Sequence, residues 1–361
     1  MNRRSFLRNS TLLTAAFALG GNTASTANTP RTMPGTKPGK RRISGMEVNP
    51  IGLGCMSMAG VYNAAMPKPD MVRLIRLAVE HGVDFFDTAE VYGPFYSEEI
   101  VGEALQPHRQ RVRIATKFGF GYEGTRVAGR NSKPAHIRTA VEGSLQRLRT
   151  DRIDLLYLHR MDPEVPIEAI AGTVKELIGE GKVGAFGLSE VAPDTIRKAH
   201  AVQPVAALQS EYSMLERVME HGILDLCAEL GIAFVPWGPL CRGMLTGRFG
   251  ADYVPEPGLR RAGVPYFTPE ALAANLRVVD LARQWATRKQ ATPGQVALAW
   301  LLAQAPHIIP IPGTTNEAHL LENIGALDVA FTGPELEELR ATLQAIPTIG
   351  CRTPETLQQD Q

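Results

Sequence analysis

The chain has 361 residues, of which 44% are hydrophobic and 21% charged, a globular composition that excludes collagen-like and wholly disordered proteins. Its 38 Lys and Arg residues balance 37 Asp and Glu residues, so the net charge of +1 gives no electrostatic reason to expect a nucleic-acid or membrane-surface partner. Beyond an N-terminal signal, no apolar run approaches the roughly 20 residues of a membrane-spanning helix.

The first 27 residues have the layout of an export signal. Arg3 and Arg4 precede Phe6, a mildly apolar stretch follows, and small residues lead to a cleavage site predicted after Ala27. This order resembles a twin-arginine signal, which carries folded proteins, and predicts a periplasmic location. The alternative is a disordered N-terminus with chance arginines, and the protein would then be cytoplasmic.

Residues 28–39 contain three prolines and no apolar periodicity, so they predict a linker. A folded domain is expected over residues 40–346, followed by a C-terminal tail at 347–361. The domain begins with a hairpin turning at Ser44-Gly45 and then alternates short apolar runs with amphipathic stretches. The predicted strands are Ile51–Gly54, Asp84–Asp87, Val112–Lys117, Ile153–His159, Gly184–Ser189, Ala206–Gln209, Ala233–Pro236 and Ile308–Ile311.

The helices expected between these strands return the chain for parallel pairing. They are Asp70–His81, Ser97–Leu105, Lys133–Leu148, Ile167–Glu180, Pro193–His200, Arg217–Leu230 and a pair within Pro269–Gln304 split at Thr292-Pro293. Eight such units favour an α/β fold of the (β/α)8 TIM-barrel type, with an N-terminal β-hairpin and extra helices after strands 7 and 8. A doubly wound sheet is the alternative.

One sequence motif and the possibility of a metal site can be set aside. Gly119, Gly121 and Gly124 match the GxGxxG spacing of dinucleotide-binding folds, but no helix follows directly to receive a pyrophosphate, so we expect a flexible active-site loop. The four cysteines and eight histidines show no metal-ligand spacing, which predicts no metal site. Structural thiols are favoured over one disulfide.

Four ionisable residues follow successive strands, where the chemistry of such barrels is located. Asp87 ends the second strand and Tyr92 follows five residues later, while Lys117 and His159 end the third and fourth strands. An ammonium beside a phenol is expected to lower the phenol pKa from about 10. Together the four groups could protonate a carbonyl oxygen while hydride attacks the carbon.

Asp87-Thr-Ala-x-x-Tyr92-Gly, Lys117 and His159 resemble the catalytic tetrad of the aldo-keto reductase superfamily, and further motifs agree from about residue 40 to 330. The resemblance implies a (β/α)8 barrel that binds NADP(H) and reduces aldehydes or ketones. Tyr92 would be the proton donor, Lys117 would lower its pKa, Asp87 would pair with Lys117, and His159 would orient the substrate.

The resemblance also implies a cofactor site. Ser189, Glu190 and Gln209 would hold the nicotinamide carboxamide, and Trp237 would stack on the nicotinamide ring. The remaining cofactor residues implied are Gly238, Pro239, Leu240 and Arg242 at the pyrophosphate, Gly313, Thr315, Asn316 and His319 at the adenosine phosphate, and Glu322 and Asn323 near the adenine.

Two departures from the family pattern bear on the cofactor. Glu190 stands where many relatives have Asn, and a carboxylate can accept only from the amide nitrogen. No Lys or Arg lies between Thr314 and His319, where a 2′-phosphate wants a cation. NADP(H) is favoured, through backbone amides near Asn316, with NAD(H) as the alternative.

A second class of function stays open, a cofactor-binding sensor or accessory subunit with little turnover; an unrelated activity on the same scaffold would require a coincidental tetrad. The predicted partner is a small-molecule carbonyl substrate. The sequence leaves open which aldehyde or ketone it is, and the oligomeric state.

Overall fold

The computed structural model describes residues 37–60, 65–258 and 260–350. The predicted export signal, most of the linker, the tail beyond residue 350 and Cys351 lie outside the described residues. In the described part, no helix is long and apolar enough to cross a membrane.

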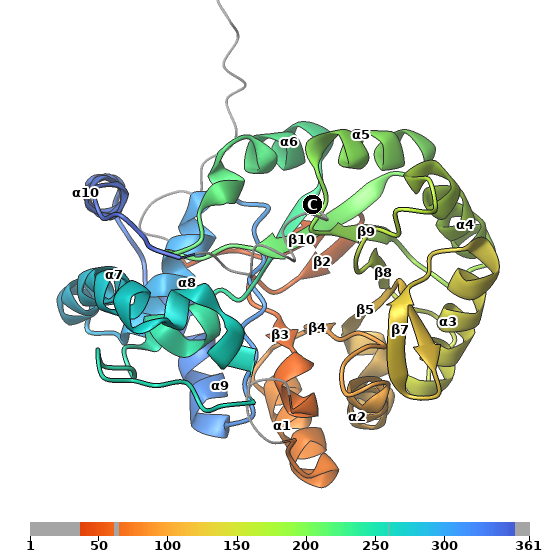
Figure 1. Ribbon diagram of the computed structural model, residues 1–361, viewed down its shortest axis with the longest axis horizontal. Coiled ribbons are helices and arrows are strands. Elements are labelled where there is room, and N and C mark those ends of the chain that lie inside the picture. The colour runs from red at the N-terminus through yellow and green to blue at the C-terminus, as the bar shows by residue number, and fades with distance from the viewer. Residues whose placement is uncertain (1–36, 61–64, 259, 351–361) are drawn as a thin grey trace, which may run out of the picture.

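Seven parallel strands form most of a barrel. Their order in the sheet, in which neighbours are hydrogen-bonded, is β11-β10-β9-β8-β5-β4-β3. The strands are β3 (Leu53–Gly54), β4 (Phe85–Asp87), β5 (Arg113–Phe118), β8 (Leu155–Leu158), β9 (Phe186–Ser189), β10 (Val205–Glu211) and β11 (Ala233–Trp237). Nearly all of their residues are buried, as expected for strands that are covered on both faces. Their C-terminal ends therefore meet at one end of the barrel, seen end-on in Figure 1.

Residues 308–313 close the ring between β11 and β3 through isolated parallel bridges at Phe234–Ile308 and Gly54–Gly313. The Ile309 and Ile311 amides donate to β11, and the Gly52 and Gly54 amides donate to the carbonyls of Pro310 and Pro312. This segment is the eighth strand expected at Ile308–Ile311. The barrel is therefore a (β/α)8 barrel, and the doubly wound alternative is wrong.

Helices surround this ring of strands. They are α1 (Lys68–Glu80), α2 (Tyr96–Leu105), α3 (Pro134–Arg147), α4 (Ile167–Gly179), α5 (Pro193–Val202), α6 (Ile223–Leu230), α7 (Pro269–Lys289), α8 (Pro293–Gln304), α9 (Glu317–Ile324) and α10 (Gly333–Gln344). The predicted split holds, because Thr292 caps α8 in a capping box with Gln295. The expected 217–230 helix is shorter, since residues 218–220 form a separate 3-10 turn.

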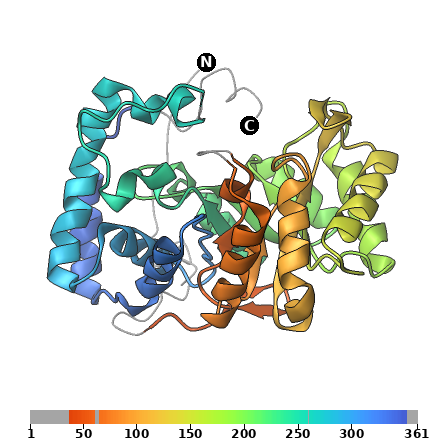
Figure 2. The same ribbon diagram turned by 90° about the horizontal axis from the view of Figure 1, so that it is seen from below.

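The two hairpins lie at opposite ends of the barrel (Figure 2). The hairpin of β1 (Arg41–Ile43) and β2 (Met46–Val48) places Ile43 and Val48 in the cluster of side chains that fills the barrel interior. At the other end, β6 (Phe120–Glu123) and β7 (Arg126–Arg130) pair antiparallel. The glycine-rich stretch expected as a loop is thus a hairpin, and the next helix is α3, so no dinucleotide-binding turn forms there.

Candidate active site

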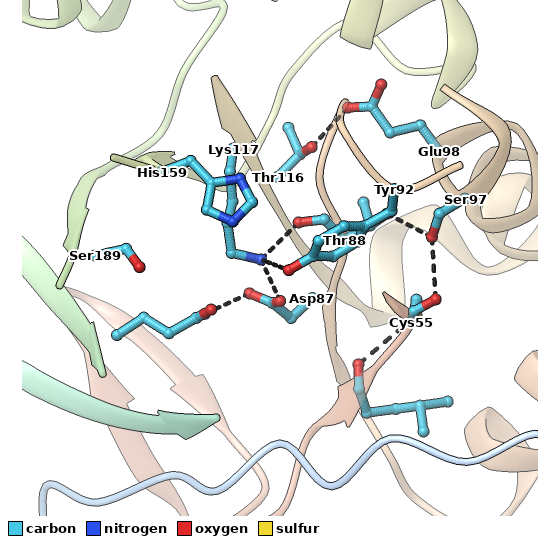
Figure 3. Close-up of polar contacts among 12 residues, drawn as sticks. Cys55, Asp87, Thr88, Tyr92, Ser97, Glu98, Thr116, Lys117, His159 and Ser189 are labelled. Atoms are coloured by element: carbon cyan, nitrogen blue, oxygen red, sulfur yellow. Dashed lines mark hydrogen bonds and ion pairs between the residues drawn. The ribbon is translucent and has the colours of Figure 1, made fainter. Parts of the chain in front are cut away.

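The four residues of the predicted tetrad converge at the C-terminal end of the barrel (Figure 3). Asp87 is the last residue of β4, Lys117 is the second-last of β5, and His159 directly follows β8. The His159 amide extends the ladder by donating to the Phe118 carbonyl. Tyr92 lies in the turn after β4, which folds back because the Tyr92 amide bonds Ala89 and the Tyr92 carbonyl accepts from Ser97.

The Lys117 ammonium is fully buried and directs a hydrogen bond at each of three oxygens. It pairs with Asp87 Oδ1, donates to the Thr88 carbonyl at 2.8 Å and donates to the Tyr92 hydroxyl at 3.2 Å. An ammonium has three N–H groups, so all three are used. The Tyr92 oxygen accepts from Lys117, and its own O–H is left to donate into the cavity.

The pKa of Tyr92 is raised, not lowered as the sequence predicted. Burial raises it, and the opposing charge of Lys117 does not compensate because Asp87 adds a negative charge beside the phenol. Burial alone would lower the pKa of Lys117, but Asp87 and Tyr92 outweigh that effect and raise it. The resting pair is therefore a neutral phenol and a charged ammonium, which suits proton donation.

His159 completes the site as a neutral imidazole. Burial, followed by the charges of Arg160, Lys117 and Arg260, holds the pKa of His159 well below its usual value. Its ring meets those of Tyr92 and Phe120 edge-on, with centroids 5.7 and 5.3 Å apart. Within the described residues, the buried Nδ1 of His159 has no hydrogen-bond partner. A neutral imidazole can donate one hydrogen bond to a carbonyl oxygen next to the phenol.

Gln209 links the tetrad to the predicted cofactor residues. Its Nε2 donates to Asp87 Oδ2 at 2.7 Å, so the amide orients the carboxylate that holds Lys117. Ser189, at the end of β9, accepts from Arg160 Nη1 at 3.1 Å. Both residues line the same cavity as Tyr92 and His159.

One continuous cavity of about 830 Å³ runs from the tetrad to the start of α9. All of the predicted site residues line it except Lys117, which lies beneath Tyr92, and Glu190. The predicted residues that line it are Asp87, Tyr92, His159, Ser189, Gln209, Trp237, Gly238, Pro239, Leu240, Arg242, Gly313, Thr315, Asn316, His319, Glu322 and Asn323. The predicted catalytic and cofactor residues thus belong to one site.

Glu190 lies outside the cavity where it was predicted to bind, and Arg242 lies in the cavity wall with a buried partner. Glu190 is buried behind Trp237, where its Oε1 accepts from the Trp237 indole at 2.7 Å and from the Glu211 amide at 2.8 Å. Arg242 lines the cavity, but its guanidinium is paired bidentately with buried Glu211 at 2.6 and 3.0 Å. The structure thus uses both side chains around Trp237 rather than directing Glu190 into the cavity.

Four cavity arginines were not singled out from the sequence. Arg160 follows His159, and Arg248, Arg260 and Arg261 come from the stretch between β11 and α7. The sequence does not indicate which arginines of that stretch reach the cavity. At the far end, Asn316 caps α9 by accepting from the His319 amide. No cluster of metal-ligating side chains occurs in the described ranges.

At the mouth of this (β/α)8 barrel, a phenol accepts a hydrogen bond from a buried ammonium and lies beside a neutral imidazole. This arrangement is that of the proton-donating site of a carbonyl-reducing oxidoreductase. A model of the aldo/keto reductase family matches residues 50–344. The chain is 42% identical to "Probable aldo-keto reductase 1" of Glycine max over 86% of this chain and 89% of that protein. The chain therefore belongs to the aldo/keto reductase family.

Solved structures agree with this assignment. A glycerol dehydrogenase from Gluconobacter oxydans superposes with a TM-score of 0.79 at 30% identity, covering 86% of this chain and 99% of that one. An aldo-keto reductase from Klebsiella pneumoniae in complex with NADPH superposes with a TM-score of 0.65 at 26% identity, covering 85% and 95%.

Proposed function

We propose that this protein reduces the carbonyl of an aldehyde or ketone to an alcohol with NADPH. The observation that carries the proposal is that all three N–H groups of the Lys117 ammonium already have acceptors. The Tyr92 oxygen is one of these acceptors, so the Tyr92 O–H can donate into the cavity of about 830 Å³. The Klebsiella pneumoniae relative in complex with NADPH supports the choice of cofactor.

The cavity fits a nicotinamide dinucleotide. Trp237 offers an indole held at its edge by Glu190, and Gly238 has a φ of 62° at the turn that follows. The amide end of α9 and the exposed Arg248 both line the cavity, where they favour phosphate. Bound NADPH supplies the hydride.

The chain's own residues handle the proton. The substrate oxygen would accept hydrogen bonds from the Tyr92 hydroxyl and the His159 imidazole, which polarises the carbonyl. As negative charge develops on that oxygen, Tyr92 transfers its proton, and the phenolate formed is stabilised by the Lys117 ammonium 3.2 Å away. Asp87, oriented by Gln209, keeps Lys117 charged throughout.

Loss of the Tyr92 hydroxyl tests this function. The Tyr92→Phe variant is expected to bind NADPH like the parent but to lose at least about 100-fold in kcat with an aromatic aldehyde, because general acid catalysis contributes about that much. NADPH oxidation at 340 nm gives kcat, and fluorescence titration gives Kd. Tyr96→Phe is the matched control, since among the described residues that hydroxyl donates to the Met66 carbonyl at 3.4 Å and not to a predicted tetrad residue. Equal turnover in Tyr92→Phe and the parent would refute the mechanism.

We also propose that residues 1–27 form a twin-arginine signal and that the protein acts in the periplasm. The support is the order Arg3-Arg4-Ser-Phe6 before an apolar stretch and a small-residue exit. Replacing both Arg3 and Arg4 by Lys is expected to hold the full chain in the cytoplasm, while Arg8→Lys leaves export intact. Cell fractionation measures this, and equal periplasmic yield of both variants would overturn the proposal.

A further inference from the structure

Two arginines from separate segments line the cavity that contains His159. Arg160 extends from the end of β8, where its Nη1 donates to the His159 carbonyl at 2.6 Å and to Ser189 Oγ at 3.1 Å. These bonds hold the guanidinium against the ends of β8 and β9. Arg260 approaches from the short helix η5 (Arg260–Gly263) in the stretch over the cavity mouth.

Both guanidiniums lie near enough to act on the tetrad. The charges of Arg160 and Arg260 each lower the pKa of His159, and Arg160 also opposes the rise in the pKa of Tyr92. Their positions in the cavity wall, together with these effects, make the surroundings of the substrate oxygen cationic.

Two acidic residues belong to the described cavity wall. They are Asp87, which is paired with Lys117, and Glu322, which lies at the adenosine end and accepts from the Thr292 hydroxyl at 2.6 Å. Among the described residues Arg260 has no salt bridge, and it is exposed while lining the cavity. Apolar groups of Met56, Val91 and Phe120 form other parts of the wall.

We propose that the preferred substrates are carbonyl compounds that carry a carboxylate, with Arg160 as the principal anion-binding residue and Arg260 as a second. The inference rests on the proposed reductase function. Hydride adds to the carbonyl carbon and the Tyr92 proton to its oxygen, giving a hydroxy acid and NADP⁺, while the carboxylate stays ionised beside the guanidiniums. Phe120, which packs edge-on against His159, would contact the carbon skeleton.

The test compares 4-carboxybenzaldehyde with its methyl ester, which lacks the negative charge and carries one more methyl group. We expect the parent to favour the acid at least about 10-fold in kcat/KM, because a charge-assisted hydrogen bond contributes roughly that factor. The preference should fall as ionic strength rises, since Arg260 is exposed. Arg160→Gln should lower the acid-to-ester ratio about 10-fold and Arg260→Gln about 3-fold.

Arg111→Gln is the control for the loss of one positive charge, because Arg111 is exposed in η2 (Gln106–Arg111) and outside the cavity wall. It should leave the ratio unchanged. The inference is overturned if the ester is reduced as efficiently as the acid, or if Arg160→Gln weakens NADPH binding without changing the ratio. If neither aldehyde is reduced, the proposed function itself fails, which is a distinguishable result.

Discussion

Glu190 shows how a single residue can support the cofactor platform without touching the cavity. Its backbone is left-handed, with a φ of 56°, and this turns the carboxylate under Trp237. Arg242, paired with Glu211, places its guanidinium 5.4 Å from the centre of the same indole. Trp237 is thus held at its edge by an acceptor and at its face by a cation.

Removing the acceptor should loosen this platform. Glu190→Leu leaves the indole N–H and the Glu211 amide without their partner, a cost of about 1–3 kcal/mol. We expect its Kd for NADPH to rise about 10-fold and its Tm to fall. Glu190→Gln keeps an acceptor oxygen and should recover most of both. Fluorescence titration and thermal melts measure the effects, and identical behaviour of the two variants would show that the hydrogen bond is unimportant.

Glu90 predicts a pH dependence of stability. This carboxyl is buried in the turn before Tyr92, and burial, reinforced by the charge of Glu98, raises its pKa to about 8. Between pH 4.5 and 8 the folded protein keeps a proton that the unfolded chain releases, so stability falls as pH rises through that window. The isosteric Glu90→Gln variant lacks this loss.

Relative to the parent, Glu90→Gln should therefore gain about 1.4 kcal/mol in free energy of unfolding for each pH unit inside the window. Urea unfolding at pH 5, 6.5 and 8 measures the difference. Glu335→Gln is a contrasting control, because the pKa of Glu335 is lowered to about 2 and its removal should cost stability at all three values. A parent-to-variant difference that stays constant with pH would contradict the assignment.

At the level of single residues, sequence spacing predicted the tetrad because each strand-end position depends only on the local pattern of one unit. Asp87, Lys117 and His159 lie where their strands end, and Tyr92 follows its turn. The direction of the Tyr92 pKa could not be predicted, since it depends on how deeply packing buries the phenol. The role of Glu190 likewise depends on Trp237, 47 residues away in the chain.

Among the elements, the eighth strand was predicted from the sequence, but the way it is hydrogen-bonded to its neighbours was not. Its apolar run predicted a strand, but in a parallel ladder alternate residues face alternate neighbours. Pro310 and Pro312 face β3 and have no N–H, so that side is held only by their carbonyls, which accept from Gly52 and Gly54. The β6–β7 hairpin was missed because glycines at 119, 121 and 124 hide the alternation of its short strands.

The contact between β3 and the closing strand at residues 308–313 should be sensitive to added side-chain bulk. A Cβ at Gly54 would lie 2.8 Å from the Ile311 carbonyl oxygen, so Gly54→Ala must push the closing strand away. We expect a loss of about 1–3 kcal/mol in free energy of unfolding by urea, together with weaker NADPH binding, because Gly54 lines the cavity. Gly172→Ala, inside α4 with open space around it, should be neutral or stabilising by up to about 1 kcal/mol. Equal stability of Gly54→Ala and the parent would show that the closing strand can move away from Gly54 without cost.

For the whole molecule, the cavity joins three parts of the chain that are distant in sequence: the tetrad strands, the stretch between β11 and α7, and the start of α9. A ligand spanning them would bind only the closed barrel. It should therefore stabilise the fold by mass action, by about 2.7 kcal/mol when free NADPH is 100 times its Kd.

The same arrangement predicts how the protein distinguishes NADPH from NADH. The segment from Thr314 to His319 has no Lys or Arg, but Arg248 reaches this cavity from the stretch after β11. An exposed guanidinium can bind a 2′-phosphate by charge-assisted hydrogen bonds. Arg248→Gln is expected to raise the Kd for NADPH about 10-fold and that for NADH less than about 2-fold, with Arg111→Gln changing neither. Thermal shifts with each cofactor give an independent readout. An equal loss of affinity for both cofactors would instead place Arg248 at the diphosphate that they share.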